Sequence, residues 1–144
     1  MLHSKGISSL EEIVVIENLK SEVIEALFNA LPVEVSFVDE NDQVRYFNKN
    51  GDRIFPRSRS ILGLKVQKCH PEKSLQKVIE ILDAFKSGNR DTAEFWINLN
   101  GRLIYIRYFC VRDKQNKYLG TLEVTQDITD IQKIKGEQRL LNWK

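Results

Sequence analysis

Residues 92–127 read TAEFWINLNGRLIYIRYFCVRDKQNKYLGTLEVTQD, and this stretch decides the fold because it predicts three consecutive antiparallel strands. Asn100-Gly101 is the strongest short hairpin signal a sequence can carry, and it separates two runs rich in β-branched and aromatic residues. A polar break at 113–117 precedes a third such run at 118–125. A sheet of at least three strands is therefore expected.

The hairpin turn fixes the expected pairing of the first two strands. If Asn100-Gly101 is a two-residue turn, Leu99 pairs with Arg102, and Glu94 lies opposite Arg107. Opposite charges on paired residues help to fix a register.

The pairing of the third strand can be counted in the same way across the loop at 113–117. A five-residue loop pairs Arg112 with Tyr118 and sets Arg107 opposite Glu123. Arg107 is thus expected between carboxylates on both neighbouring strands.

This register also assigns each side chain to a face of the sheet. One face is nearly all apolar and needs a cover from the rest of the chain. Its predicted members are Phe95, Ile97, Ile104, Ile106, Tyr108, Cys110, Leu122 and Val124. The other face is mixed, with Glu94, Trp96, Tyr105, Arg107, Phe109 and Glu123.

The bulk composition is that of a soluble domain. The chain has 144 residues, of which 42% are hydrophobic and 29% charged, with a formal net charge of +2. This balance predicts neither nucleic-acid nor membrane binding, and no apolar run approaches the ~18 residues of a membrane span. Two cysteines, Cys69 and Cys110, with no export signal predict reduced thiols and a cytoplasmic location.

Helical patterns flank the predicted strands. A helix is expected over 10–30, broken near Lys20-Ser21 and closed by Pro32. It either covers the mixed face of the sheet or mediates dimerisation. A second helix is expected at the C-terminus over 129–142, where Thr129 and Gln132 form a capping box.

The most regular helix follows His70-Pro71-Glu72 and ends at Gly88. Its apolar stripe is Leu75, Val78, Ile79, Leu82 and Phe85, which is the natural lid for the apolar face. Two short strands, 33–38 and 43–48, precede it and complete a five-stranded antiparallel sheet.

This order of elements resembles the PAS domain family over about residues 30–130. The resemblance rests on the segments 37–39, 45–48, 61–63 and 120–129, the last of which contains the Asp-Ile-Thr ending. It implies an α+β PAS-like fold, with one long helix and several short ones covering the five-stranded sheet. The domain boundaries implied are a helical extension at 1–30, a PAS domain at 31–130 and an exit helix at 131–144.

A closer resemblance rests on the segments 53–55, 69–74, 95–97 and 118–127. These are similar to the PAS module of a prokaryotic group in which the module often follows a hemerythrin-like di-iron domain. No helical His/Glu ligand set of that kind is present in this sequence.

The PAS resemblance implies a sensor or signalling module and not an enzyme. The sequence agrees, because it carries no Gly-rich phosphate loop, no Ser/His/Asp set and no metal-ligand spacing. The implied pocket residues are His70, Cys69, Val78, Leu82, Phe95, Ile97, Ile104, Ile106, Tyr108, Leu122 and Val124. Signal output is expected at Asp127, Ile128 and Thr129.

Two interpretations of Cys69-His70 stay open. Imidazole and thiolate are haem-iron ligands, and haem-binding PAS domains place a histidine near the long helix, so His70 is the candidate ligand. Alternatively, His70 caps the helix and Cys69 packs as a small hydrophobic residue. The cysteine motif of flavin-binding PAS domains is absent. The function expected is ligand sensing in the pocket, and the alternative is a ligand-free PAS fold used for homodimerisation or docking of a partner protein.

Overall fold

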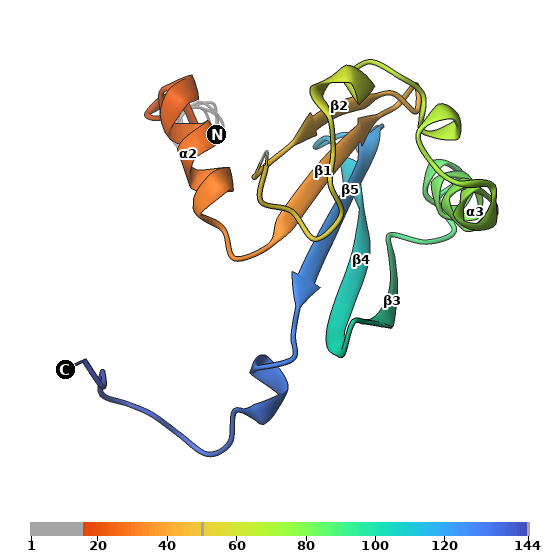
Figure 1. Ribbon diagram of the computed structural model, residues 1–144. Coiled ribbons are helices and arrows are strands. Elements are labelled where there is room, and N and C mark those ends of the chain that lie inside the picture. The colour runs from red at the N-terminus through yellow and green to blue at the C-terminus, as the bar shows by residue number, and fades with distance from the viewer. Residues whose placement is uncertain (1–15, 50, 144) are drawn as a thin grey trace.

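The computed structural model describes residues 16–49 and 51–143 (Figure 1). Its helices are α2 (Ser21–Ala30) and α3 (Glu72–Ser87), with 3-10 helices η1 (Arg59–Ile61), η2 (Val66–Lys68) and η3 (Ile131–Lys133). Its strands are β1 (Glu34–Asp39), β2 (Val44–Phe47), β3 (Thr92–Leu99), β4 (Arg102–Arg112) and β5 (Tyr118–Asp127). None of the helices in these ranges is long and apolar enough to cross a membrane.

The five strands form one antiparallel sheet in the order β2-β1-β5-β4-β3. The last strand of the chain therefore lies in the middle of the sheet, between β1 and β4. The predicted α+β architecture, a five-stranded antiparallel sheet with helices packed on it, is confirmed.

The predicted hairpin register is correct. Leu99 pairs with Arg102, and Glu94 pairs with Arg107. Both turn residues, Asn100-Gly101, have positive φ values of 52° and 80°, as a two-residue hairpin turn of this kind requires.

The register predicted for β5 is wrong by one residue beyond its first pair. Arg112 pairs with Tyr118 as expected, but Val111 pairs with Gly120, so Leu119 has no partner and forms a β-bulge. The bulge coincides with a close approach of strands. Gly120 has a φ of +155°, and a Cβ atom there would lie 2.2 Å from the carbonyl oxygen of Val38 on β1.

The bulge moves each following side chain of β5 to the other face of the sheet. Arg107 pairs with Val124, whereas Glu123 pairs with Tyr108. Leu122 and Val124 therefore lie on the face of Arg107, and their assignment to the apolar face was wrong. Thr121, Glu123 and Thr125 take their place on that face.

Arg107 consequently does not lie between two carboxylates. Within the described part of the chain it forms no ion pair with Glu94 or Glu123. Its guanidinium instead lies over the rings of Tyr105 and Phe109, with centroid distances of 4.8 and 5.6 Å. Glu94 accepts a hydrogen bond from the hydroxyl of Tyr105.

Helix α3 covers the opposite face, as predicted. It begins after Pro71 and ends at Gly88, which has a φ of 80° and lies at the C-cap. The buried residues of this helix are Val78, Leu82 and Phe85. Val78 and Leu82 pack with Val44 and Val66, whereas Phe85 packs with Ile104, Ile106 and Tyr108. The core therefore has two apolar clusters along one helix.

The N-terminal helix is broken at the predicted place, because α2 begins after Lys20. Residues 10–15 of the predicted helix lie outside the described residues. No residue of α2 is buried, and Trp96 on the mixed face is 62% exposed. The helix therefore does not cover the aromatic part of that face.

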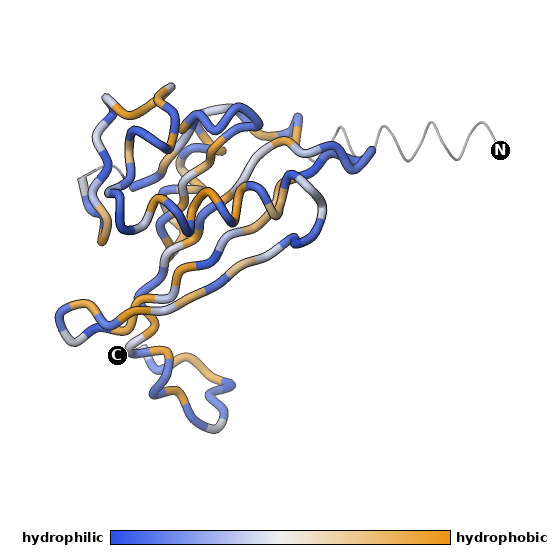
Figure 2. Tube along the Cα trace, turned by 90° about the vertical axis from the view of Figure 1, so that its right-hand side faces the viewer, coloured by the Kyte–Doolittle hydropathy of each residue, from blue (hydrophilic) through white to orange (hydrophobic). Residues whose placement is uncertain are grey.

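The exit helix predicted over 129–142 is wrong. Only η3 is helical there, and the chain beyond β5 leaves the sheet in both views, with several hydrophobic residues along it (Figures 1 and 2). The hydroxyl of Thr129 accepts a hydrogen bond from the amide of Leu103 and donates one to Asp127, so it does not cap a helix. A short helix without a packing partner is marginal in water.

Gly120→Ala tests the close approach that accompanies the bulge. We expect it to destabilise the fold by roughly 2–5 kcal/mol, because the new methyl group overlaps β1 and the backbone conformation favours glycine. Urea denaturation measures the loss. Gly101→Ala is the matched control, since its φ is also positive but nothing lies within 4 Å of the added atom. Equal losses in the two variants would contradict the close approach.

Candidate functional site

A small cavity of about 30 Å³ lies between the middle of α3 and the sheet. It is bounded by residues from four strands, the 57–70 connection and α3. These are Ser36, Val38, Val44, Arg57, Ile61, Val66, Cys69, His70, Val78, Leu82, Tyr108, Thr121 and Glu123.

Five of the predicted pocket residues line this cavity: Cys69, His70, Val78, Leu82 and Tyr108. The structure places the other six elsewhere. Phe95, Ile97, Ile104 and Ile106 belong to the second apolar cluster around Phe85, and Leu122 and Val124 lie on the opposite face.

Sequence reasoning missed most of the polar lining, which comprises Ser36, Arg57, Thr121 and Glu123. Thr121 and Glu123 were assigned to the wrong face because the bulge was not foreseen. The glycine of Leu119-Gly120 was the available signal, since a glycine inside a strand pattern often marks a bulge. Arg57 lies in a polar segment that gave no regular pattern.

His70 does not cap α3. The N-cap residue is Pro71, and no side chain caps the helix. The His70 ring instead approaches the preceding turn, with its Nδ1 atom 3.2 Å from the carbonyl oxygen of Val66. If Nδ1 carries the proton and donates to that carbonyl, Nε2 has a free lone pair.

Cys69 packs against the apolar cluster of Val44, Val66, Val78 and Leu82. Its Sγ atom lies 3.5 Å from the carbonyl oxygen of Lys65. This part of the alternative interpretation of Cys69-His70, a cysteine that packs as a small hydrophobic residue, describes the structure well.

Haem does not fit this site. A cavity of about 30 Å³ holds roughly two or three water-sized groups, because one such group needs ~10–15 Å³ of this volume. A free Nε2 on His70 is a suitable donor, but the space for a macrocycle is filled by Val66, Val78 and Leu82. Nor does any group of three or more His, Cys, Asp or Glu residues in the described ranges form a metal site.

The polar side of the cavity is formed by Tyr108, Glu123 and Arg57. One Nη atom of Arg57 lies 3.7 Å from Oε1 of Glu123, and the hydroxyl of Thr125 donates to the same carboxylate over 3.4 Å. Burial, with the neighbouring Glu123 carboxylate, raises the pKa of Tyr108 far above its usual range. The Tyr108 hydroxyl therefore remains protonated and neutral.

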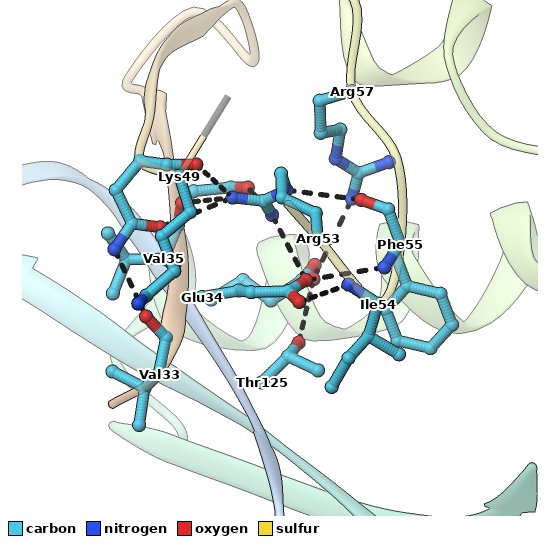
Figure 3. A network of polar contacts seen from close by, with 12 residues as sticks. Val33, Glu34, Val35, Lys49, Arg53, Ile54, Phe55, Arg57 and Thr125 are labelled. Atoms are coloured by element: carbon cyan, nitrogen blue, oxygen red, sulfur yellow. Dashed lines mark hydrogen bonds and ion pairs between the residues drawn. The ribbon is translucent and has the colours of Figure 1, made fainter. Parts of the chain in front are cut away.

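A buried ion pair holds the loop that carries Arg57 against β1 (Figure 3). The side chain of Arg53 is 2% exposed, and its guanidinium lies 3.7 Å from Glu34. It donates to the carbonyl oxygens of Asn48 and Phe55, over 2.7 and 3.1 Å. Glu34 accepts from the amides of Ile54 and Phe55. The loop is thereby fixed on both sides of Arg53.

The predicted output residues form a turn that is bonded to the β3–β4 hairpin. We call Asp127, Ile128 and Thr129 the exit turn. Asp127 accepts from the amide and hydroxyl of Thr129, over 3.0 and 2.6 Å, and from Nε of Arg102 over 2.7 Å. Leu103 of β4 completes the contact. Its carbonyl oxygen accepts a hydrogen bond from the amide of Ile128 over 2.9 Å, and its amide donates one to the hydroxyl of Thr129.

Comparison with known families assigns this fold. A family model described as "PAS domain" matches residues 24–129. The chain belongs to the PAS domain family. A comparison with curated proteins finds no match.

Solved structures agree with the PAS assignment. A C-terminal domain from Streptococcus mutans is 32% identical, with a TM-score of 0.76, over 81% of this chain and 91% of that one. The PAS domain of BvgS from Bordetella pertussis is 17% identical, with a TM-score of 0.57, over 75% and 85%. A sensory box sensor histidine kinase from Vibrio cholerae is 10% identical, with a TM-score of 0.54, over 88% and 98%.

The fold of this chain thus resembles that of a sensor histidine kinase domain, and the PAS family to which the chain belongs is generally sensory and non-catalytic. Besides the chain beyond β5, two parts of the fold expose apolar side chains outside the cavity. One is the stripe on and before α2, formed by Ile16, Leu19, Val23, Leu27 and Leu31. The other is the aromatic part of the mixed sheet face around Trp96.

The exit turn of this PAS domain predicts a pKa that can be measured. Hydrogen bonds from Thr129 and Arg102 lower the pKa of Asp127 to about 2, from its ordinary value of 3.8. Because the folded pKa is depressed, the stability due to Asp127 is present above the unfolded value and is lost as the pH falls from about 4 to about 2.

Carboxyl-carbon NMR titration measures this pKa directly. We expect about 2 in the native protein and a value closer to 3.8 in Arg102→Gln or Thr129→Val. Asp113 in the 113–117 loop serves as the internal reference, since neither substitution touches it. An Asp127 pKa unchanged by both substitutions would show that the exit turn is not held by these bonds.

Proposed function

We propose that this PAS domain is a sensor whose cavity beneath α3 binds a small molecule and passes the change to the exit turn. The observation that carries the proposal is the arrangement of β5. Thr121, Glu123, Thr125 and Asp127 alternate onto one face of this strand, so the cavity and the exit turn share a single row of side chains.

The cavity and the exit turn lie close together along β5. Glu123 at the cavity and Asp127 in the exit turn are four residues apart, which is about 13 Å along a strand. Glu123 is connected within the row through the hydroxyl of Thr125. A ligand that changes the position of Glu123 would act on a central strand that is paired on both sides, and its effect would reach Arg102 through Asp127.

The proposed ligand is much smaller than haem, as the cavity volume requires. We place the domain in the cytoplasm of a prokaryote, which the two free cysteines and the bacterial relatives support. A relation to PAS modules that follow a hemerythrin-like domain is part of the same proposal, and a relative that is a C-terminal domain supports it. The division into 1–30, 31–130 and 131–144 also stays a prediction.

Val78→Ile tests whether the cavity is a ligand site. The extra methylene occupies most of the cavity, so we expect a small molecule extractable from the freshly purified native protein to be absent from the variant. Mass spectrometry of the extracts and an absorption spectrum of the protein detect it. Val23→Ile adds the same group on exposed α2 and serves as the control.

An NMR measurement of the exit turn completes this test. Stripping the native protein of its ligand should shift the NMR signals of the Ile128 and Thr129 amides. If the native and variant proteins both yield no ligand, and the exit turn has the same spectrum in each, the fold is ligand-free and this proposal is wrong.

A second candidate function is homodimerisation or docking of a partner protein, and the apolar stripe of α2 favours it. Leu27 is 52% exposed, and no residue of the ten-residue helix is buried. An isolated helix shorter than ~12–15 residues is marginal in water, so the stripe needs a packing partner. We propose that the partner is the α2 stripe of a second copy, next to the aromatic face around Trp96.

Leu27→Gln tests this second function. We expect the native chain to sediment as a dimer at tens of micromolar and the variant to be a monomer, because a polar group replaces the centre of the stripe. Glu22→Gln on the same helix, which lies outside the stripe, should leave the dimer intact. A monomeric native chain under these conditions would remove the support for dimerisation.

A further inference from the structure

Arg57 is the permanently cationic side chain among those that line the cavity. Its side chain is 19% exposed, and the 3.7 Å contact with Glu123 is its one ion pair among the described residues, where it has no hydrogen bond. That distance exceeds a hydrogen bond. A guanidinium carries five N–H donors in a planar fork, so most of the donors of Arg57 are available to a ligand.

Arg53, on the same loop, shows the contrast. Its Nε and both Nη atoms donate hydrogen bonds to Phe55, Asn48, Val35 and Ser36. The loop therefore contains one arginine whose donors are used by the fold and another that lines the cavity and has no hydrogen bond among the described residues. A planar fork without acceptors beside a mostly apolar cavity matches a carboxylate, which accepts two parallel hydrogen bonds.

The surrounding charges allow an added anion. Arg53 is compensated by Glu34, which also accepts from two backbone amides. Glu123 has the Thr125 hydroxyl at 3.4 Å and the neutral Tyr108 hydroxyl beside it. It therefore keeps polar neighbours when a ligand takes the remaining donors of Arg57. The negative charge of Glu123 still repels an anionic ligand. Removing this charge should therefore strengthen ligand binding, whereas removing the charge of Arg57 should weaken it.

The apolar wall sets the size of the ligand. Val44, Val66, Val78 and Leu82 form it, and the volume of about 30 Å³ admits roughly two or three carbon-sized groups. We infer that the cavity binds a short-chain aliphatic monocarboxylate, with its carboxylate on the Arg57 guanidinium and its tail against this wall. The inference rests on the proposed sensing function and names the class of ligand for it.

Titration with sodium butanoate, followed by amide NMR, tests the inference. We expect saturable shifts at His70, Val78 and Thr121, and binding at least tenfold weaker for butanamide and for octanoate. Butanamide keeps the shape but lacks the charge, whereas octanoate keeps the charge but has too long a tail.

Substitutions of single charges give the sharpest reading. Arg57→Gln should weaken butanoate binding at least tenfold, whereas Arg59→Gln, which changes an exposed arginine two residues away, should not. Glu123→Gln should strengthen binding several-fold, because it removes the competing carboxylate. Arg57 forms no hydrogen bond with the residues that the structure describes, so its variant should fold normally, and a thermal melt verifies this.

The outcomes separate the ligand class from the sensing function. Equal binding of butanamide and butanoate, or equal losses in Arg57→Gln and Arg59→Gln, would overturn the carboxylate assignment while leaving a ligand site. Butanoate binding without any shift at Ile128 and Thr129 would support the ligand class and contradict signal output through the exit turn. If neither compound perturbs the cavity amides, the inference is wrong.

Discussion

The bulge at Leu119 is the constraint on which the rest of the structure depends. A single unpaired residue at the start of β5 decides which side chains of the central strand face α3. With the bulge, Thr121, Glu123 and Thr125 lie on the α3 face. Without it, the apolar side chains of Leu122 and Val124 would face α3, and the cavity would have no carboxylate. The polarity of the cavity is therefore a consequence of strand register.

The Glu34–Arg53 pair is the second constraint, because it positions the loop that closes the cavity. Both side chains are almost fully buried, and removing one partner of such a pair typically costs ~3–5 kcal/mol. The pair is costly to desolvate, but Glu34 and Arg53 are each bonded to backbone groups of the loop and of β1. The geometry of Arg57 thus derives from an ion pair whose two members are not among the residues that line the cavity.

The elements of this fold could be predicted from sequence because they follow local signals. Asn100-Gly101 fixed one hairpin, and the stripe ending at Gly88 fixed α3. The face of β5 could not be predicted by counting loop residues, because a bulge adds a residue without changing the hydrophobic pattern much. Gly120 is a local sign of a bulge, but the approach of Gly120 to Val38 on another strand, which accompanies the bulge, is a tertiary contact that the local sequence does not reveal.

The candidate site was predicted less completely for a related reason. The members found in advance, such as Val78 and Leu82, belong to the periodic stripe of a helix. Those missed depend on tertiary contacts: Arg57 on a loop held by the Glu34–Arg53 pair, and Glu123 on the bulge. The exit helix failed in the same way, since the capping pattern at Thr129 was real but its hydroxyl is bonded to Leu103 instead.

The position of β5 also limits how a signal could leave the cavity. A strand paired on both sides resists bending, so steric pressure from a small tail would be spread over β1, β4 and β5. A change in the ion-pair partner of Glu123 is more selective than steric pressure. It acts on one carboxylate in the row of β5 side chains that ends at Asp127. An anion on Arg57 would weaken the long ion pair with Glu123 while leaving the Glu34–Arg53 pair in place. If the domain works as proposed, electrostatic exchange at Glu123 would therefore be a more effective trigger for the exit turn than the filling of space.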